Sequence, residues 1–406
     1  MNEADIAGIA DWVVQRGLAG DDEITLLHGF CERCVAAELA ITRGIAIIDT
    51  LHPVYEGRVF YWSGDKPPET LISQYEPTTG SQDSGWLNSP FYDLLQSGED
   101  EMRRRLHLGE TADFSVLEEL RREGQTDWLA MVQRFDKEAA IGEMDCFMSR
   151  WTTADPGGFA DADVVALRRL VPVLGLAIKS VSLARVAQSL VEAYLGRDAG
   201  RRVLAGKVSR GAAERINAVI WFSDMQGYTS LSERIESHEL LPLLNDYSEV
   251  AITSVHAAGG DVLKLMADGV LAIFTADDPA EASAAALNAE AELRRKIADL
   301  NERRSAAGQP VSSIYLGLHI GDVFYGNIGS KDRLDFTVVG QAVNEASRIA
   351  SMCRSVDRDV LFSSDFRASL PEAEQPRLVS VGRYALKGVG RPQELFTLDP
   401  EIAAGS

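Results

Sequence analysis

The chain has 406 residues, a length that allows two or three domains, and a hydrophobic fraction of 46% that permits a sizeable core. Acidic residues outnumber basic ones 61 to 40, which gives a formal net charge of −21. A surface this acidic repels nucleic-acid backbones and anionic lipids, so the composition argues against a nucleic-acid partner. A nucleotide ligand stays compatible with it, because a local basic pocket with metal ions can override the global field.

The sequence also predicts a cytoplasmic protein without a membrane span. No run reaches the roughly 18 continuous apolar residues that a span needs. The longest candidate, residues 170–178, is too short and contains Pro172. The N-terminal "MNEADIAGIADWVV" is acidic and amphipathic, unlike a signal peptide. Four cysteines in so long a chain, without a secretory signal, indicate reduced thiols in a cytosol.

Residues 1–180 predict a mixed α+β domain. Its first part, residues 3–40, has the pattern of one or two amphipathic helices broken near "LAGDDE". The next elements expected in chain order are strands in 41–50 and 57–64, a Gly-, Ser- and Pro-rich loop over about 65–90, short helices in "SPFYDLLQ" and "FSVLEELRREG", strands in "DWLAMVQRF" and "EMDCFMSRWTT", and a long helix capped by Asp161 or Asp163.

The end of this domain, "SRWTTADPGGFADADVVALRRLVPVLGLAI", resembles the last strand and final helix of GAF-type sensor domains. The resemblance implies a GAF-like α/β sensor or regulatory domain that responds to an unknown ligand or signal. The alternative is an unrelated α+β domain of unknown role. Four tryptophans could line a sensor pocket or simply pack in the core: Trp62, Trp86, Trp128 and Trp151.

Residues 181–215 are predicted to form a helical linker and transducer element. The helix over about 161–195 has apolar residues at three-four spacing, and the pattern shifts near its end. A helix that outlasts its own domain usually pairs with a second copy in a coiled coil; packing on its own domain is the other interpretation. The Gly- and Arg-rich stretch 194–216 then connects this helix to the C-terminal half of the chain.

The pattern becomes regular over residues 216–400. A strand at 217–223 precedes a helix that opens at "TSLSERI", with Thr229 or Ser230 as N-cap and Glu233 placed for a capping box. The remaining predicted elements are a helix in "LLPLLNDYSEVAITSVHAAGG", a hairpin over 261–275, a long helix from 279 to 306, two strands joined at Gly321, a helix in "AVNEASRIASMC", a strand in "DVLFSSD" and a closing hairpin in "VGRYALKGVGRPQELFTL".

Two aspartates in this region point to chemistry. Asp224 ends one strand, and Asp268 lies in the turn of the hairpin "LMADGVLA". Two carboxylates at strand ends can share divalent cations, and oxygen ligands suit Mg²⁺ or Mn²⁺. The helix after Asp224 opens at "QGYTS", where Gly227 allows close approach of an anion to free backbone N–H groups. Together these features describe a polyphosphate site; a strand-end aspartate that caps a helix is the alternative.

Five ordered motifs bear on this choice: "FSDMQGYT", "GGDVLKLMADGVLAIF", "GLHIGDVFYGNIGS", "DFTVVGQAVNEASRI" and "YALKGVG". Together they resemble the class III nucleotidyl cyclases, over about residues 194–396. The two aspartates are 268 − 224 = 44 positions apart, as in that family. The resemblance implies a ferredoxin-like α/β catalytic domain over residues 216–400.

The resemblance also implies roles for individual residues. Asp224, Asp268 and the carbonyl of Met225 would bind two ions, Mg²⁺ or Mn²⁺, in each active site. Lys264 and Thr337 would read the base, and Asn344 and Arg348 would act on the ribose and the transition state as the catalytic pair. The phosphates would be met by Lys387 and by the segment Gly227, Tyr228 and Thr229.

A lysine and a threonine at the base-reading positions imply ATP as substrate, because guanylyl cyclases usually carry glutamate and cysteine there. The implied enzyme is an adenylate cyclase that makes 3′,5′-cyclic AMP and pyrophosphate. In the family, metal and base residues come from different subunits, which implies a head-to-tail homodimer with two composite sites. A guanylyl cyclase and a catalytically silent nucleotide-binding regulator are the alternatives.

Some residues depart from the family or stand outside its motifs. Ala267 replaces a usual glycine, Gln341 replaces an aspartate or asparagine, and Asp335 lies two places before the base-reading Thr337 and is assigned no role.

"CERC", with Cys31 and Cys34, has the spacing of a metal or redox pair, although a helix with Cys34 packed inside is the simpler interpretation. His107 could meet a sensor ligand or lie on the surface, and His319 reads as a hydrogen-bonded core residue.

Overall fold

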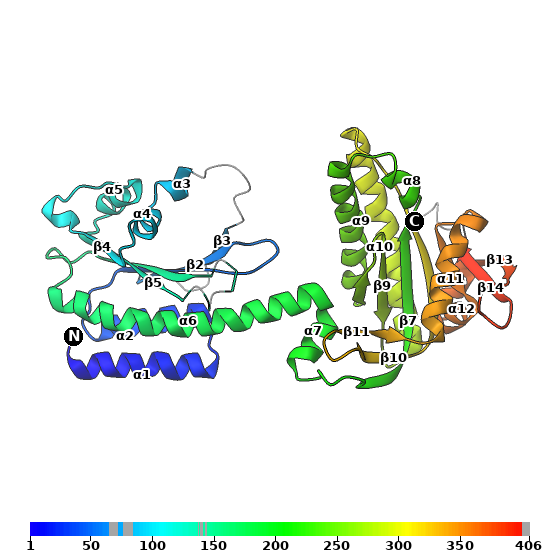
Figure 1. The fold of residues 1–406 in the computed structure, drawn as a ribbon, viewed down its shortest axis with the longest axis horizontal. Coiled ribbons are helices and arrows are strands. Elements are labelled where there is room, and N and C mark those ends of the chain that lie inside the picture. The colour runs from blue at the N-terminus through cyan, green and yellow to red at the C-terminus, as the bar shows by residue number, and fades with distance from the viewer. Residues whose placement is uncertain (65–71, 76–83, 137, 139–140, 143, 400–406) are drawn as a thin grey trace. The chain divides into compact units, whose positions relative to one another are not determined.

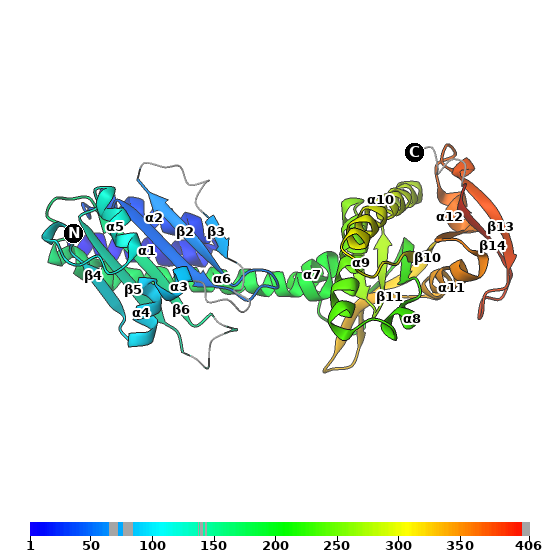
Figure 2. The same ribbon diagram turned by 90° about the horizontal axis from the view of Figure 1, so that it is seen from above.

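A computed structural model describes residues 1–64, 72–75, 84–136, 138, 141–142 and 144–399. Their contacts divide the chain into two compact units, Met1–Leu190 (unit 1) and Val191–Ser406 (unit 2). Both are mixed α/β structures, each built on one sheet (Figures 1 and 2). Most of the loop predicted over residues 65–90 lies outside the described residues.

Unit 1 contains a six-stranded antiparallel sheet in the order β3-β2-β1-β6-β5-β4. The predicted strands at 41–50 and 57–64 and in the two later segments are confirmed, whereas β3 and β4 were not predicted. The strands are β1 (Arg43–Asp49), β2 (Gly57–Ser63), β3 (Ile72–Tyr75), β4 (Glu101–Arg104), β5 (Asp127–Arg134) and β6 (Cys146–Thr153).

Helices cover both faces of this sheet (Figure 1). One face packs against α1 (Glu3–Ala19), α2 (Glu23–Ala36) and α6 (Asp161–Leu195), and the other packs against α4 (Pro90–Ser97) and α5 (Ser115–Arg122), near α3 (Ser84–Leu87) and the short 3₁₀ helix Leu106–Leu108. The predicted break after the first helix is confirmed: Gly20 ends α1 in the left-handed region, with φ 83°, and Asp22 caps α2.

Helix α6 has the predicted span and is partly a core helix. One face of its first half, between Val164 and Ile178, is buried against α1, α2 and the sheet of unit 1. For this half, packing on its own domain is therefore confirmed. By length and composition alone α6 could also cross a membrane, although 44% of its most apolar stretch is buried in the fold.

Unit 2 is built on an eight-stranded sheet in the order β13-β14-β12-β10-β7-β9-β8, with β11 paired to β10. The strands are β7 (Ala213–Met225), β8 (Asp261–Leu265), β9 (Gly269–Phe274), β10 (Ile314–Gly329), β11 (Leu334–Val339), β12 (Val360–Ser363), β13 (Leu378–Tyr384) and β14 (Gln393–Leu398). Central β7 is bordered by β9 and β10, so the segment ending in Asp224 lies in the middle of the sheet.

The helices of unit 2 are α7 (Arg197–Leu204), α8 (Tyr228–Ser232), α9 (Ser237–Ala257), α10 (Pro279–Ala306), α11 (Gln341–Val356) and α12 (Ser364–Ser369), with a 3₁₀ turn at Gln375–Arg377. Helices α9 and α10 pack on one face of the sheet, and α11 packs on the other (Figure 1). The span of α10 matches its prediction, because Asp278 caps it and Pro279 begins it.

Two predictions for unit 2 were wrong. Neither Thr229 nor Ser230 caps a helix, since α8 begins at Tyr228 after Gly227 in the left-handed region, and no side chain caps it. The strands expected on either side of Gly321 are one 16-residue strand, β10, in which a Cβ at Gly321 would meet Ala342 of α11 at 2.9 Å. This glycine allows a helix to approach rather than making a turn.

Candidate active site

Two carboxylates face each other at the end of β7. Asp224 of β7 is hydrogen-bonded to Asp268, which lies in the β8–β9 turn. The pKa of Asp224 is raised to about 7, first because the carboxyl is partly withdrawn from water and then because Asp268 is beside it. Within the described part of the chain, no lysine or arginine forms an ion pair with either aspartate.

The sheet itself brings this pair together. Asp224 lies opposite Gly269 in the β7–β9 register, and the backbone N–H of Met225 donates to the Asp268 carbonyl at 2.7 Å. A Cβ at Gly269 would meet the Ser223 carbonyl oxygen at 2.1 Å. Only glycine allows the two strands to come this close, and this role of Gly269 was not predicted from the sequence.

The residues present fit a divalent cation. Two carboxylates without a basic partner are costly to keep ionised side by side, and a bound cation would remove that cost. Oxygen ligands are those that Mg²⁺ and Mn²⁺ prefer. Asp224 and Asp268 would hold the ions, with the Met225 carbonyl as the further predicted ligand.

The segment after Asp224 is a tight turn rather than a long helix. Gly227 has a φ of 68° and open space where a Cβ would stand, and the five-residue α8 comes directly after it. Tyr228 packs partly against the core, whereas Thr229 is exposed. The turn leaves its backbone accessible, but so short a helix adds little to the binding of an anion.

The predicted base-reading residues lie together with an unexpected partner. The ammonium of Lys264 on β8 forms an ion pair with Asp335 of β11 at 2.6 Å. Thr337 lies two residues further along β11, so its side chain is on the same face of that strand as Asp335. The sequence assigns no role to Asp335, and the structure instead places it in contact with the predicted base reader.

Asn344 and Arg348 lie one turn apart on α11, and both are exposed, as their spacing predicts. The opposite face of α11 is buried and includes a polar group, Glu345. Its carboxylate accepts hydrogen bonds from Gln341 at 2.7 Å and Gln393 at 2.5 Å, which fixes the orientation of the helix. Gln341, a departure from the family pattern, is thus a structural residue here.

His319 completes this buried network, and the prediction of a hydrogen-bonded core residue is confirmed. Its Nδ1 lies 2.8 Å from the Ser363 hydroxyl, and its Nε2 lies 3.5 Å from Glu345. Burial lowers the pKa of His319, while the nearby Glu345 carboxylate acts in the opposite direction.

Lys387 is exposed in the connection between β13 and β14. In the described portion of the structure, no hydrogen bond or ion pair joins the aspartate pair to Lys264, Asn344, Arg348 or Lys387. One chain therefore presents the predicted groups as separate sets on its surface. The arrangement can bind a cation at one set and offer hydrogen-bond donors at the others, which suits a phosphate-bearing substrate.

Unit 1 offers weaker candidates. Cys31 and Cys34 are buried in α2, and burial raises the pKa of each thiol, to about 12 for Cys34. Protonated thiols make poor metal ligands, so the helical interpretation of "CERC" fits better. Trp62, Trp128 and Trp151 are buried, whereas Trp86 is 40% exposed. His107 is exposed, and its Nδ1 lies 2.9 Å from the Thr126 carbonyl.

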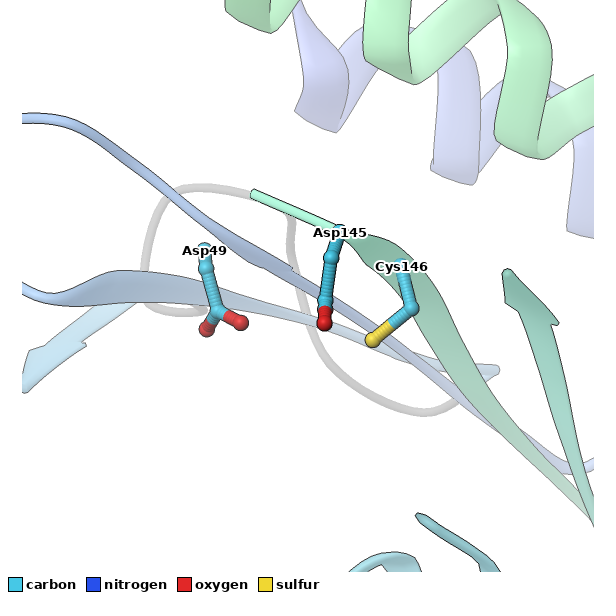
Figure 3. Close-up of side chains that lie close together, drawn as sticks. All are labelled: Asp49, Asp145 and Cys146. Carbon is cyan, nitrogen blue, oxygen red and sulfur yellow. The ribbon is translucent and has the colours of Figure 1, made fainter. Parts of the chain in front are cut away.

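One further cluster brings together Asp49 at the end of β1, Asp145 and the first residue of β6, Cys146, with ligand atoms within 4.8 Å of one another (Figure 3). Burial, followed by the negative charge of Asp145, raises the pKa of the Cys146 thiol. A thiol that stays protonated is not prepared to bind a metal, and no other described residue at the cluster points to an ion.

Similarity to known proteins is concentrated in unit 2. A family model described as the adenylate and guanylate cyclase catalytic domain matches residues 212–399. An adenylate cyclase of Anabaena cylindrica is 34% identical over 175 residues, which are 42% of this chain and 34% of that protein. The chain spans less than two fifths of the length of this and other curated relatives.

Two solved structures are similar over 46% of this chain, each at 26% identity. The adenylyl cyclase CyaB from P. aeruginosa is covered to 96% with a TM-score of 0.42. The guanylyl cyclase Cya2 is covered to 93% with a TM-score of 0.41. The matching family model is itself named for both adenylate and guanylate cyclases, so it does not decide between the two bases.

Proposed function

We propose that this chain, whose residues 212–399 belong to the adenylate and guanylate cyclase catalytic domain family, is an adenylyl cyclase converting ATP into 3′,5′-cyclic AMP and pyrophosphate. The observation that carries the proposal is the facing pair Asp224 and Asp268, which has no basic partner within the described residues and lies at the end of the central strand. A site built only for stability would pair these charges.

In the reaction the ribose 3′-oxygen attacks the α-phosphorus and forms the new O–P bond. The bond from that phosphorus to the bridging oxygen breaks, pyrophosphate leaves, and the proton of the 3′-hydroxyl passes to solvent or to a nearby carboxylate. Two divalent cations, Mg²⁺ or Mn²⁺, supply positive charge for this step when bound at the aspartate pair.

The chain's own residues position the substrate. Asn344 would hold the ribose, and Arg348, one turn away on the same exposed face, would donate to the oxygens of the reacting phosphate. A guanidinium suits that position because its donors form a rigid fork. Lys387 would meet the terminal phosphates, and the accessible turn Gly227–Thr229 would lie along them.

Lys264 supports ATP over GTP. Its ammonium is a hydrogen-bond donor only, and adenine N1 is an acceptor. Guanine carries a hydrogen on N1, so its N1–H would face the lysine ammonium donor to donor. Because the sugar and phosphate contacts fix the position of the base, guanine could not shift away, and GTP would bind poorly. Thr337 would accept from the exocyclic amine, although a hydroxyl can also donate and therefore discriminates less.

The active unit in this proposal is a head-to-tail homodimer with two composite sites. The separation of the predicted groups into sets on one chain supports it, because one set could face another across a two-fold axis. Unit 1 would act as a GAF-like regulator of the catalytic unit in the cytoplasm. A single antiparallel sheet covered on both faces by helices supports a domain of that kind.

The proposal is tested on the purified full-length chain with Mn²⁺ and either ATP or GTP, with cyclic nucleotide and pyrophosphate both quantified. We expect cyclic AMP from ATP, and a loss of at least about 1,000-fold in Asp224→Asn, because several kcal/mol of charge stabilisation disappear. Asp299→Asn, an exposed carboxylate of α10, is the matched control. Cyclic GMP as the main product would favour a guanylyl cyclase. Binding of nucleotide without any product would favour a catalytically silent regulator.

The dimer is tested by mixing two inactive variants, Asp224→Asn and Arg348→Ala. A mixed dimer has one site carrying both substitutions and one site carrying neither. Statistical exchange of subunits should therefore restore about a quarter of the wild-type activity. Activity that stays absent after demonstrated subunit exchange would show that each site is built from one chain.

A further inference from the structure

The ion pair between Lys264 and Asp335 joins residues that are 71 positions apart in the sequence. The two side chains remain 52% and 43% exposed, respectively. The strand β8 that carries Lys264 is irregular at this place, because its register with β9 shifts between Val262 and Lys264. Irregularities of this kind redirect a side chain, and here the redirected residue is the lysine that reaches β11.

The position of Asp335 on β11 is equally specific. Side chains alternate along this strand, with Phe336 and Val338 buried in the core and Asp335 and Thr337 on the other face. This side of β11 therefore presents three polar groups close together: the ammonium of Lys264, the carboxylate of Asp335 and the hydroxyl of Thr337. The carboxylate is the strongest hydrogen-bond acceptor of the three, and it can only accept.

This set matches the edge of an adenine ring. Adenine presents an acceptor at N1 beside a donor, the N6 amine. A lysine ammonium has three donors, so it can keep its bond to Asp335 and still donate to N1. A carboxylate next to it can accept from the N6 amine. Guanine, held in the same place, has a donor at N1 and an acceptor at its 6-position, so both contacts would fail.

We propose that Asp335 is a specificity-determining residue: its carboxylate holds the ammonium of Lys264 and accepts from the N6 amine of adenine beside Thr337. The proposal rests on the proposed function, whose site it refines. It also explains why a threonine is enough at the base-reading position. A hydroxyl can either accept or donate a hydrogen bond, and the carboxylate two residues earlier supplies a group that can only accept from the N6 amine.

A purely structural role would predict a different outcome. Half-exposed ion pairs contribute little to folding, so the loss of Asp335 should hardly change the thermal stability of the protein. A role in base recognition instead changes the ratio of specificities for ATP and GTP, which a structural contact would not move.

The test compares wild type, Asp335→Asn and Asp335→Glu in two assays: kcat/KM for ATP and GTP with Mn²⁺, and equilibrium binding of fluorescent ATP and GTP analogues. Asp335→Asn should lower the ATP:GTP ratio by about tenfold to a hundredfold. Most of the change should appear in KM and in binding, with kcat for ATP within about threefold of wild type. Asp335→Glu, which keeps the carboxylate, should retain most of the selectivity.

Asp332→Asn is the matched control, because this exposed aspartate lies just before the same strand and its loss removes the same charge. It should behave as wild type. A double-mutant cycle with Lys264→Ala adds a second criterion: if the pair acts together, the doubly substituted chain should be no less selective than Lys264→Ala alone.

A folded Asp335→Asn variant with a wild-type ATP:GTP ratio overturns the inference while leaving the cyclase proposal intact. A wild-type chain that binds nucleotide without turnover contradicts the cyclase proposal, and the binding assay still decides the role of Asp335. A wild-type chain that binds neither nucleotide overturns both.

Discussion

The carboxylates near the two sheets have opposite surroundings: basic partners surround them in unit 1, and a second acid faces one of them in unit 2. In unit 1, Asp127 is fully buried and accepts from Arg103 at 2.6 Å and from the backbone N–H groups of Trp128 and Phe159. In unit 2, Asp224 faces a second acid, and its pKa is raised to about 7 by partial burial and by Asp268. The first arrangement maintains the fold, whereas the second leaves two acids side by side without a basic partner among the described residues.

A second carboxylate of unit 1 behaves in the same way as Asp127. Glu23, 1% exposed at the start of α2, accepts from Arg58 of β2 at 3.0 Å and from Ser182 and Arg185 of α6 at 3.1 and 2.9 Å. It therefore ties a helix, a strand and the far part of α6 together. The two buried carboxylates of unit 1 thus have basic partners, whereas Asp224 and Asp268 have none among the described residues.

The largest effect on stability should come from breaking a paired carboxylate. Asp127→Ala leaves Arg103, which is only 15% exposed, without its buried carboxylate partner, so we expect a loss of about 3–5 kcal/mol in the free energy of unfolding. Urea denaturation monitored by tryptophan fluorescence measures it, because five of the six tryptophans lie in unit 1.

The control for Asp127→Ala is Asp113→Ala, whose pair with Arg104 is partly exposed on both sides and should contribute less than about 1 kcal/mol. Equal losses of stability in the two variants would mean that the buried carboxylate contributes no more to folding than the exposed one. The contrast between the two units would then lose its structural half.

A second substitution acts on the backbone that holds the unpaired carboxylates. Gly269→Ala would place a methyl group 2.1 Å from the Ser223 carbonyl oxygen, and a backbone atom in a central strand cannot yield cheaply. We expect a loss of about 1–3 kcal/mol in the free energy of unfolding together with a large loss of turnover, because β9 and β7 must separate beside Asp224.

Gly8→Ala provides the matched control in unit 1. A Cβ there meets nothing within 4 Å, and alanine in the interior of α1 should stabilise the helix by about 0.5–1 kcal/mol. If Gly269→Ala also proves harmless to both stability and turnover, the close approach of the two strands is not what positions the aspartates.

How far the sequence predicts this site depends on the range of the interactions involved. The span of α10, which a capping aspartate begins, was predicted to the residue, and the span of α6 agrees with its approximate predicted bounds. The cap of α8 was wrong because a left-handed Gly227 begins that turn instead of a side chain. Local rules describe long periodic elements well and five-residue turns poorly.

Contacts between distant strands lie beyond such rules. Spacing along the chain does not show that β8 and β11 meet, so it gives no reason to select Asp335, and the requirement for glycine at position 269 appears only when β9 lies against β7. Strands β3, β4 and β11 were not predicted either, since they are short, polar or at an edge, and partner strands stabilise them more than their own composition does.

Asp224→Asn sharpens the comparison, because the loss of a carboxylate should here stabilise the protein. The folded-state pKa lies above the ordinary value of 3.8, so ionisation favours unfolding and stability falls as pH rises from about 4 through 7. In metal-free buffer at pH 8 we expect a gain of about 1 kcal/mol or less, since Asp224 stays exposed to solvent, or about 1–3 °C in Tm.

The same variant should lose the stabilisation that Mn²⁺ gives to wild type. At pH 3, below the ordinary pKa of 3.8, its advantage should vanish, because Asp224 is then largely protonated in both states. Asp299→Asn, exposed on α10, should show neither effect. A variant that is less stable than wild type at pH 8 without metal would indicate that the pair contributes to folding, as in unit 1.

The smallest effect concerns His319, a buried base that contacts the buried face of α11. Burial lowers the pKa of His319 from its ordinary value of 6.5, while Glu345 and Asp365 act in the opposite direction. The unfolded chain therefore binds the proton more readily, and stability should fall as pH drops below about 6.5. We expect His319→Asn to remove up to about 1 kcal/mol of this pH dependence between pH 7.5 and 5.

Urea denaturation across that range measures the pH dependence of stability, with exposed His238→Asn as control. Identical slopes for wild type and His319→Asn would mean that Glu345 offsets burial completely, so that α11 rests on a network insensitive to pH.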